Sequence, residues 1–203
     1  MAYLAGMSDV KIANLALSHL GVSATIQSFT ERSTEASVMS LWYDFARLQV
    51  LESHDWSFAR KVVDLAKHSD APSGVWAFRF QRPSDCVTIR TLVNPLGRQM
   101  DAVPFQLENS LDGETETILT DLSPATCRYT FNATAPNLFS PAFIQCLSYL
   151  LAHYTAMPLT GSQDMQAVAM QQFVRTQRGA AAMNANEAVG DKPRDAEWII
   201  SRG

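Results

Sequence analysis

The most strongly patterned stretch of the chain runs from Glu35 to Trp56, where the hydrophobic positions predict a long helix. Ser33 or Thr34 can cap its start. Its apolar residues form two faces instead of the single stripe of an ordinary surface helix, which indicates burial on several sides. The first face carries Met39, Trp42, Tyr43, Ala46 and Val50, and the second carries Val38, Leu41, Phe45 and Leu48.

Two interpretations of the second face remain open. It can belong to the core of a monomer, or it can lie between the helix's own domain and a neighbouring subunit. Periodicity alone supports both interpretations. The second one predicts a subunit interface made of Val38, Leu41, Phe45 and Leu48.

A shorter helix is expected ahead of the long one. Ser8 and Asp9 open it, apolar residues follow at helical spacing, and Gly21 ends it. His19 lies on its apolar side, as a core or edge histidine and not a metal ligand. The long helix should end near His54, with a turn or short strand after it. We place this whole helical section at about residues 8–66.

From residue 75 the hydrophobic period changes from helical to alternating, which predicts β-structure. Strands are expected at residues 75–80, 86–93, 117–120 and 126–131. A weaker strand or extended arm at 100–107 contains Pro104, which would confine it to a sheet edge. The segment from about 75 to 131 is therefore predicted to be a small, mostly antiparallel β-region.

Helical periodicity returns at Ser140 and Pro141, a serine cap followed by proline at the first helical position. This helix should end at Pro158 and Gly161. A last helix runs from Ser162 to about Ala188, and its thin apolar stripe suggests that it leans on something outside its own fold. The predicted fold is α+β and mainly helical: an antiparallel helix bundle, at about 8–66 and 140–189, with the β-region inserted between the second and third long helices.

The end of the chain, residues 191–203, is polar except for Trp198, Ile199 and Ile200. We expect residues 1–190 to form a single domain and this extended tail to follow it. The apolar cluster either folds back on its own domain or docks into a partner, since large apolar groups are unusual at an exposed terminus.

Charge and cysteine usage narrow the function classes. The net charge is −4 and no block of like charges occurs, so the basic stripe typical of DNA-binding proteins is missing. The three cysteines have no CxxC spacing, which favours structural thiols in a reducing compartment. The scattered histidines predict no metal site. No cofactor, secretory leader or membrane span is expected, so the protein should be made in the cytoplasm.

Motifs of catalysis are not found in the sequence. GxSxG, GxxxxGK[ST], GxGxxG and HExxH do not occur. Glu31 and Glu35 would lie one helical turn apart, a common surface arrangement. Asp44, Glu52 and Asp55 lie at or beside the narrow polar side of the long helix, where solvated charges are expected. The sequence therefore does not predict an enzyme.

Several short patterns occur in a recognisable order. SDVKIANLALSHLG at 8–21 is followed by YDFAR at 43–47 and LESHDWSFAR at 51–60. An element containing Trp76, Phe78, Phe80, Pro83, Asp85 and Cys86 comes next, then ILTD at 118–121, CRYTF at 127–131 and SPAF at 140–143. Each is a packing or turn pattern, and their serial order carries the match. In this order, over roughly residues 8–160, the chain resembles the tail tubular protein A family, the head-to-tail adaptors of short-tailed bacteriophages.

The resemblance implies a structural virion protein of the tail or neck. It implies a dodecameric ring between the portal protein and the tail nozzle protein, with genomic DNA passing through the channel without sequence-specific binding. It also implies a C-terminal segment that reaches the portal, and we assign portal docking to Trp198, Ile199 and Ile200 by inference. Two alternatives stay open: a virion-carried cell-wall (peptidoglycan) hydrolase, which would need two facing carboxylates, and a DNA-binding module.

Overall fold

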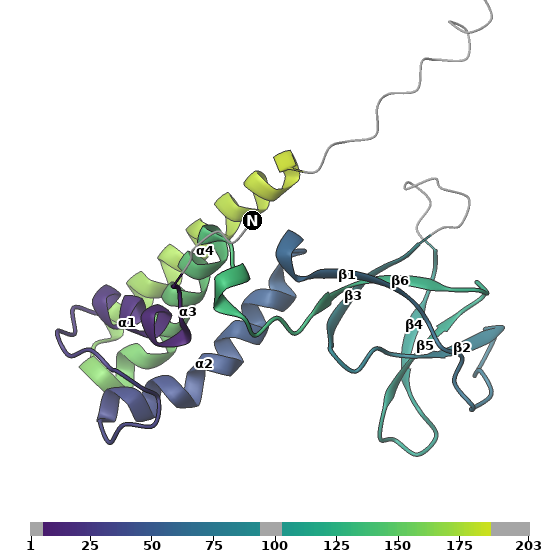
Figure 1. Cartoon of the computed structure of the whole chain (residues 1–203), viewed down its shortest axis with the longest axis horizontal. Coiled ribbons are helices and arrows are strands. Elements are labelled where there is room, and N and C mark those ends of the chain that lie inside the picture. Colours follow the sequence, from purple (N-terminus) through teal and green to yellow (C-terminus); the bar gives the residue numbers. More distant parts are fainter. Residues whose placement is uncertain (1–5, 94–102, 188–203) are drawn as a thin grey trace, which may run out of the picture.

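The chain has a helical region and a β-region that lie side by side (Figure 1), as seen in a computed structural model that describes residues 6–93 and 103–187. The helices are α1 (Asp9–His19), α2 (Thr34–Ser53), α3 (Pro141–Thr160) and α4 (Gln163–Glu187). Two short 3-10 helices, η1 (Ser57–Ala59) and η2 (Pro136–Leu138), lie where the chain passes between the regions. The predicted α+β class is confirmed, with four helices and two small antiparallel sheets in the described residues.

Side-chain caps fix the starts of three helices, as the sequence predicted. The hydroxyl oxygens of Ser8, Ser33 and Ser140 accept hydrogen bonds from the backbone N–H groups of Lys11, Ala36 and Phe143. Such caps satisfy donors that have no partner inside the helix. Gly161 ends α3 with φ of 65°, a left-handed conformation that glycine adopts without steric cost. Pro158 does not end α3 but lies inside it.

The β-region consists of two three-stranded sheets instead of one. The first has the order β1 (Arg60–Asp64), β6 (Thr126–Phe131), β3 (Cys86–Val93), and the second has β2 (Phe78–Gln81), β5 (Glu116–Thr120), β4 (Gln106–Asn109). All the pairings are antiparallel. The predicted strands at 86–93 and 126–131 are confirmed, and the strand near Pro104 is an edge strand as expected.

The predicted end of the long helix near His54 and the short strand allowed after it are confirmed, but the outer boundary of the helical section is wrong. Helix α2 ends at Ser53, and Arg60–Asp64 is strand β1, so the helical section does not extend to residue 66. Side chains from beyond the helix donate to the carbonyls of its last turn and its cap. The indole N–H of Trp56 donates to the carbonyl of Val50 over 2.7 Å. The Arg90 guanidinium, from β3, donates to the carbonyls of Leu51, Glu52 and His54.

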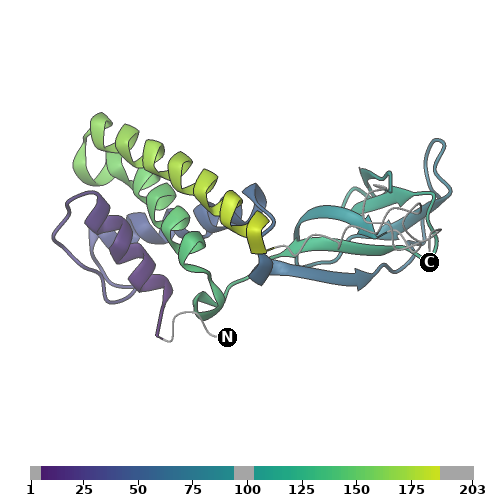
Figure 2. The same cartoon turned by 90° about the horizontal axis from the view of Figure 1, so that it is seen from above.

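Each region has its own core. The core of the helical region gathers apolar residues of all four helices, among them Ile12, Met39, Leu147 and Phe173. The smaller core of the β-region contains Phe80, Leu92, Ile118, Ala125, Cys127 and Tyr129. Helix α3 packs against α1, α2 and α4, and Figure 2 shows α3 and α4 running side by side. Helix α4 therefore packs on its own chain, and the expected support from outside its fold stays a prediction.

Two arginines join the regions. Arg90 fastens β3 to the end of α2, as described above, and its Nε also donates to Thr130 Oγ1 over 2.8 Å. Arg47, on α2, is 4% exposed and donates to Asn132 Oδ1 and to the carbonyl of Ala133, just beyond β6. Hydrogen bonds from a charged donor are stronger than neutral ones, so α2 is held firmly against the β-region.

Candidate interaction surface

The predicted subunit interface forms an exposed apolar stripe on α2, which we call the α2 stripe: Val38, Leu41, Phe45 and Leu48. Leu41 is 72% exposed and Phe45 is 54% exposed, whereas Val38 and Leu48 are half-buried. The opposite face of the helix is in the core, with Met39, Ala46 and Val50 buried. Within the described residues, the interior of the monomer therefore uses one of the two predicted apolar faces and leaves the centre of the other exposed to solvent.

Aromatic rings support the α2 stripe from one side. Trp42 stacks on Tyr154 of α3, with ring centroids 4.9 Å apart and planes 10° from parallel. Phe45 meets the same ring edge-on, with centroids 5.6 Å apart. The Tyr154 hydroxyl donates to Gln49 Oε1, so the ring is held in place from both ends. This packing keeps Phe45 in position at the surface, and a rigid apolar group loses little conformational entropy when a partner covers it.

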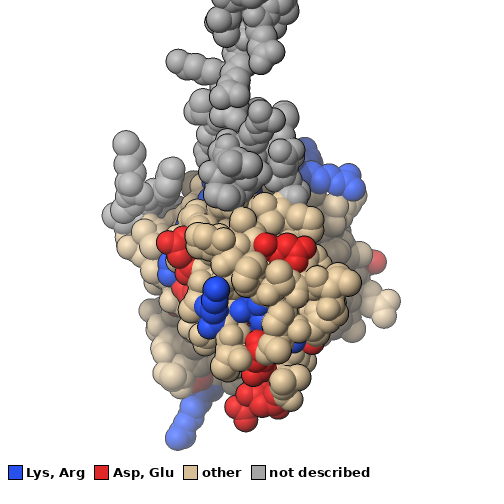
Figure 3. Space-filling model, turned by 90° about the vertical axis from the view of Figure 1, so that its right-hand side faces the viewer, with Lys and Arg blue, Asp and Glu red and all other residues tan. Residues whose placement is uncertain are grey.

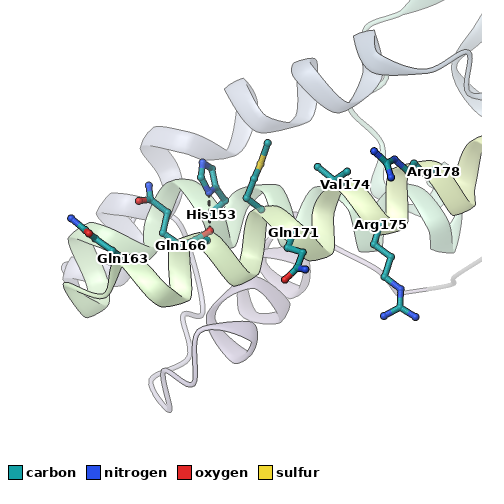
Figure 4. Close-up of a pocket in the computed structure, with 9 residues that line it drawn as sticks. His153, Gln163, Gln166, Gln171, Val174, Arg175 and Arg178 are labelled. Carbon is teal, nitrogen blue, oxygen red and sulfur yellow. Dashed lines mark hydrogen bonds between the residues drawn. The ribbon is translucent and has the colours of Figure 1, made fainter.

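A second apolar feature lies beside α4, and the sequence did not predict it. An open groove of about 820 Å³ is lined mainly by one side of α4, including Ala167, Met170, Val174 and Arg178, with His153 contributed by α3. Figure 4 shows Val174 and Arg178 on the same side of α4 as His153. The His153 ring lies 3.0 Å from the carbonyl of Gln166, which ties α3 to α4. We call this feature the α4 groove.

The α4 groove escaped prediction because it needs two helices to exist. In the sequence, the exposed Met170 lies among glutamines and alanines, and this composition does not indicate a binding surface. Its neighbour Val168 is also 51% exposed. Only the packing of α4 on α3 decides which of these side chains line a groove.

The remaining predicted site falls outside the described residues. Trp198, Ile199 and Ile200 belong to residues 188–203, so portal docking by the tail stays a prediction.

The hydrolase alternative needs two facing carboxylates, and one small pocket holds a pair. Asp9 and Asp44 line a pocket of about 160 Å³ together with Tyr43 and Arg47. Both carboxylates already accept hydrogen bonds, Asp9 from the Tyr43 hydroxyl over 2.6 Å and Asp44 from Arg47. Ligand sites usually measure roughly 300–1,000 Å³, so this pocket is small for a sugar chain.

The cysteines and histidines lie in separate, structural positions. Cys127 and Cys146 are buried, Cys86 is half-buried, and all three are unpaired. Burial raises the pKa of the Cys127 thiol to about 12 and also raises the pKa of the other two, which disfavours the reactive thiolate. His19 stacks on Tyr149 and lies 3.1 Å from the Ser148 hydroxyl. No cluster of three potential metal ligands occurs among residues 6–93 and 103–187.

Charges are mixed on the surface at the β-region end of the molecule. On the end of the molecule formed by the β-region, acidic and basic side chains are interspersed and neither sign dominates (Figure 3). Among the described helices, none is long and apolar enough to cross a membrane. The exposed apolar residues of α2 and α4 are therefore the features that most clearly point to a partner.

Comparison with protein-family models finds no match for this chain, and comparison with curated proteins finds none either. The resemblance to the adaptor family therefore depends on the residues of the sequence alone.

Proposed function

We propose that this chain is a structural subunit of a ring that joins a phage portal to its tail nozzle and lets DNA pass through its channel. In this proposal the four helices form the antiparallel bundle of the subunit body, and the tail at 191–203 fastens the ring to the portal. The protein would act in the virion tail or neck and would catalyse no reaction.

The observation that supports the proposal best is the α2 stripe. Leu41 and Phe45 lie exposed in the middle of a helix whose other face is fully packed. Exposed apolar groups that are contiguous and held in place typically mark protein–protein interfaces. A ring buries the same stripe once in every subunit, because closed rings use heterologous contacts in which two different surfaces meet.

The acidic balance of the chain also supports the proposal. A channel that lets DNA slide should avoid tight phosphate contacts, since each lysine or arginine on a phosphate adds to binding. A net charge of −4 without basic runs fits that requirement. A DNA-binding module would instead need a concentrated basic surface.

The proposal is tested by imaging the purified protein at low resolution, alone and mixed with portal protein. We expect rings with a central channel, and rings stacked on portals in the mixture. Deleting residues 191–203 should leave the protein folded and ring-forming but unable to bind the portal. Particles without a channel, or a truncated protein that still binds the portal, would contradict the respective part of the proposal.

A further inference from the structure

The exposed side of α2 and the lining of the α4 groove have similar helical spacing. Leu41, Phe45, Leu48 and Glu52 follow one another on one side of α2 at positions i, i+4, i+7 and i+11. Ala167, Met170, Val174 and Arg178 line the groove at i, i+3, i+7 and i+11. Both series span eleven residues of helix, or about 16 Å at a rise of about 1.5 Å per residue. The apolar residues of one row can therefore meet those of the other when the two helices lie along each other.

The two surfaces also carry opposite charges at corresponding ends. Exposed Glu52 ends the series on α2. Exposed Arg178 ends the series on α4, with Arg175 nearby. Neither arginine forms a salt bridge within the part of the chain that the structure describes. If the two helices run in the same direction, Glu52 reaches Arg178 while the apolar positions meet.

We propose that the α2 stripe of one copy of this chain docks in the α4 groove of a second copy. Phe45 and Leu48 cover Met170 and Val174, and Glu52 of α2 pairs with Arg178 of α4. Complementary charges at the border of an apolar contact set orientation and discourage the reversed arrangement. This inference rests on the proposed ring, because a head-to-tail contact between the α2 stripe and the α4 groove can repeat around a closed ring of subunits.

Two single-cysteine variants test the contact. Phe45→Cys and Met170→Cys are each made with Cys86→Ser, because Cys127 and Cys146 are buried. A short bismaleimide is added to each variant alone and to their mixture. We expect cross-linked dimers mainly in the mixture, with Leu111→Cys, at an exposed turn of the β-region, as the control that does not cross-link with Met170→Cys.

Charge exchange gives an independent readout. Glu52→Arg or Arg178→Glu alone should weaken self-association about fivefold, the effect of losing one exposed pair, and the double variant should regain most of it. The inference would be overturned if the Phe45→Cys variant cross-linked with itself as efficiently as with the Met170→Cys variant. In that case the α2 stripes of two copies would contact each other. The inference would also be overturned if the single variants Glu52→Arg and Arg178→Glu associated as the wild type does.

The native mass of the protein separates this inference from the proposed ring. A large assembly that gives no cross-link between positions 45 and 170 overturns the stripe-in-groove contact and leaves the ring intact. A specific cross-link in a protein whose native mass is only that of a dimer supports the contact and contradicts the ring.

Discussion

The two apolar faces of α2 are both made of hydrophobic residues, but one is buried in the core and the other is largely exposed to solvent. Met39, Ala46 and Val50 are fully buried against the rest of the helical region, whereas Leu41 and Phe45 are more than half exposed. A third side of the same helix carries Arg47, which is buried against the β-region. One helix thus serves the core, the joint between the regions and a free surface.

The difference between the faces shows what hydrophobic content alone leaves undecided. An apolar side chain is stabilised by any cover that removes water, from its own chain or from another. The face with Leu41 and Phe45 is as hydrophobic as a core face, but no other part of the described chain packs over its centre. Substitutions on the two faces should therefore change different properties: the stability of the subunit on one side, and its association on the other.

The largest expected effect follows from Met39→Glu. Met39 is fully buried in the helical core, and a carboxylate there would lose its hydration without gaining a partner. We expect a loss of more than about 3 kcal/mol of unfolding free energy, enough to unfold many domains. Circular dichroism and thermal melting measure it. A Met39→Glu protein that melts as the wild type does would show that this face is not the core face.

A smaller loss is expected from Arg47→Met, on the third side of α2. Methionine fills the space of the aliphatic stem but removes the bonds to Asn132 and Ala133. Leaving these acceptors without a partner should cost about 1–3 kcal/mol in urea unfolding. Arg60→Met is the control, because the pair of Arg60 with Asp55 lies nearer the surface. Equal losses for the two variants would mean that Arg47 does not hold the regions together.

Cysteine replacement should have modest effects. Cys127→Ala and Cys146→Ala remove buried thiols from the two cores and should each cost about 1 kcal/mol, while half-buried Cys86 should cost less. Association should be unchanged, because none of these thiols is on the α2 stripe. The measurements are urea unfolding and native mass. A cysteine variant that keeps its stability but loses its assembly would contradict a purely structural role.

The smallest effect is a pH dependence of stability at His19. Burial lowers the pKa of His19 below its ordinary 6.5, so the unfolded chain binds a proton at higher pH than the folded chain. The stability that neutral His19 contributes to the folded state is complete above about pH 6.5 and is lost as the pH falls towards the folded-state pKa. Burial also lowers the pKa of His54, which adds to the same slope. His19→Gln should reduce the loss of stability between about pH 7 and pH 5.5; an unchanged slope would contradict the assignment.

Much of the fold was predictable because its signals are local. The serine caps, the Pro141 start of α3 and the alternation in β3 and β6 all lie within the elements they define. The end of α2 near His54 was also predictable, whereas the part that Arg90 plays in holding this end, from about 36 residues further along the chain, was not. Strand β1 was expected only as a turn or short strand within the helical section, because its side chains are mostly exposed and lack a clear alternation.

The candidate site divides in the same way. The α2 stripe was predictable, since it follows from the spacing of residues within one helix. The α4 groove was not, because its shape arises from the packing of α4 against α3 and from His153 between them. The tail residues Trp198–Ile200 belong to the part of the sequence that the structure does not describe, so their role stays a prediction.

The central claim, that the exposed face of α2 is an interface and not a spare part of the core, is tested most directly by native mass. Leu41→Glu and Leu111→Glu make the same chemical change at sites of 72% and 80% exposure, one on the α2 stripe and one in a turn of the β-region. We expect the wild type and Leu111→Glu to form large assemblies. Leu41→Glu should remain a folded monomer whose unfolding free energy is within about 0.5 kcal/mol of the wild-type value. A Leu41→Glu protein that assembles like Leu111→Glu would contradict the claim.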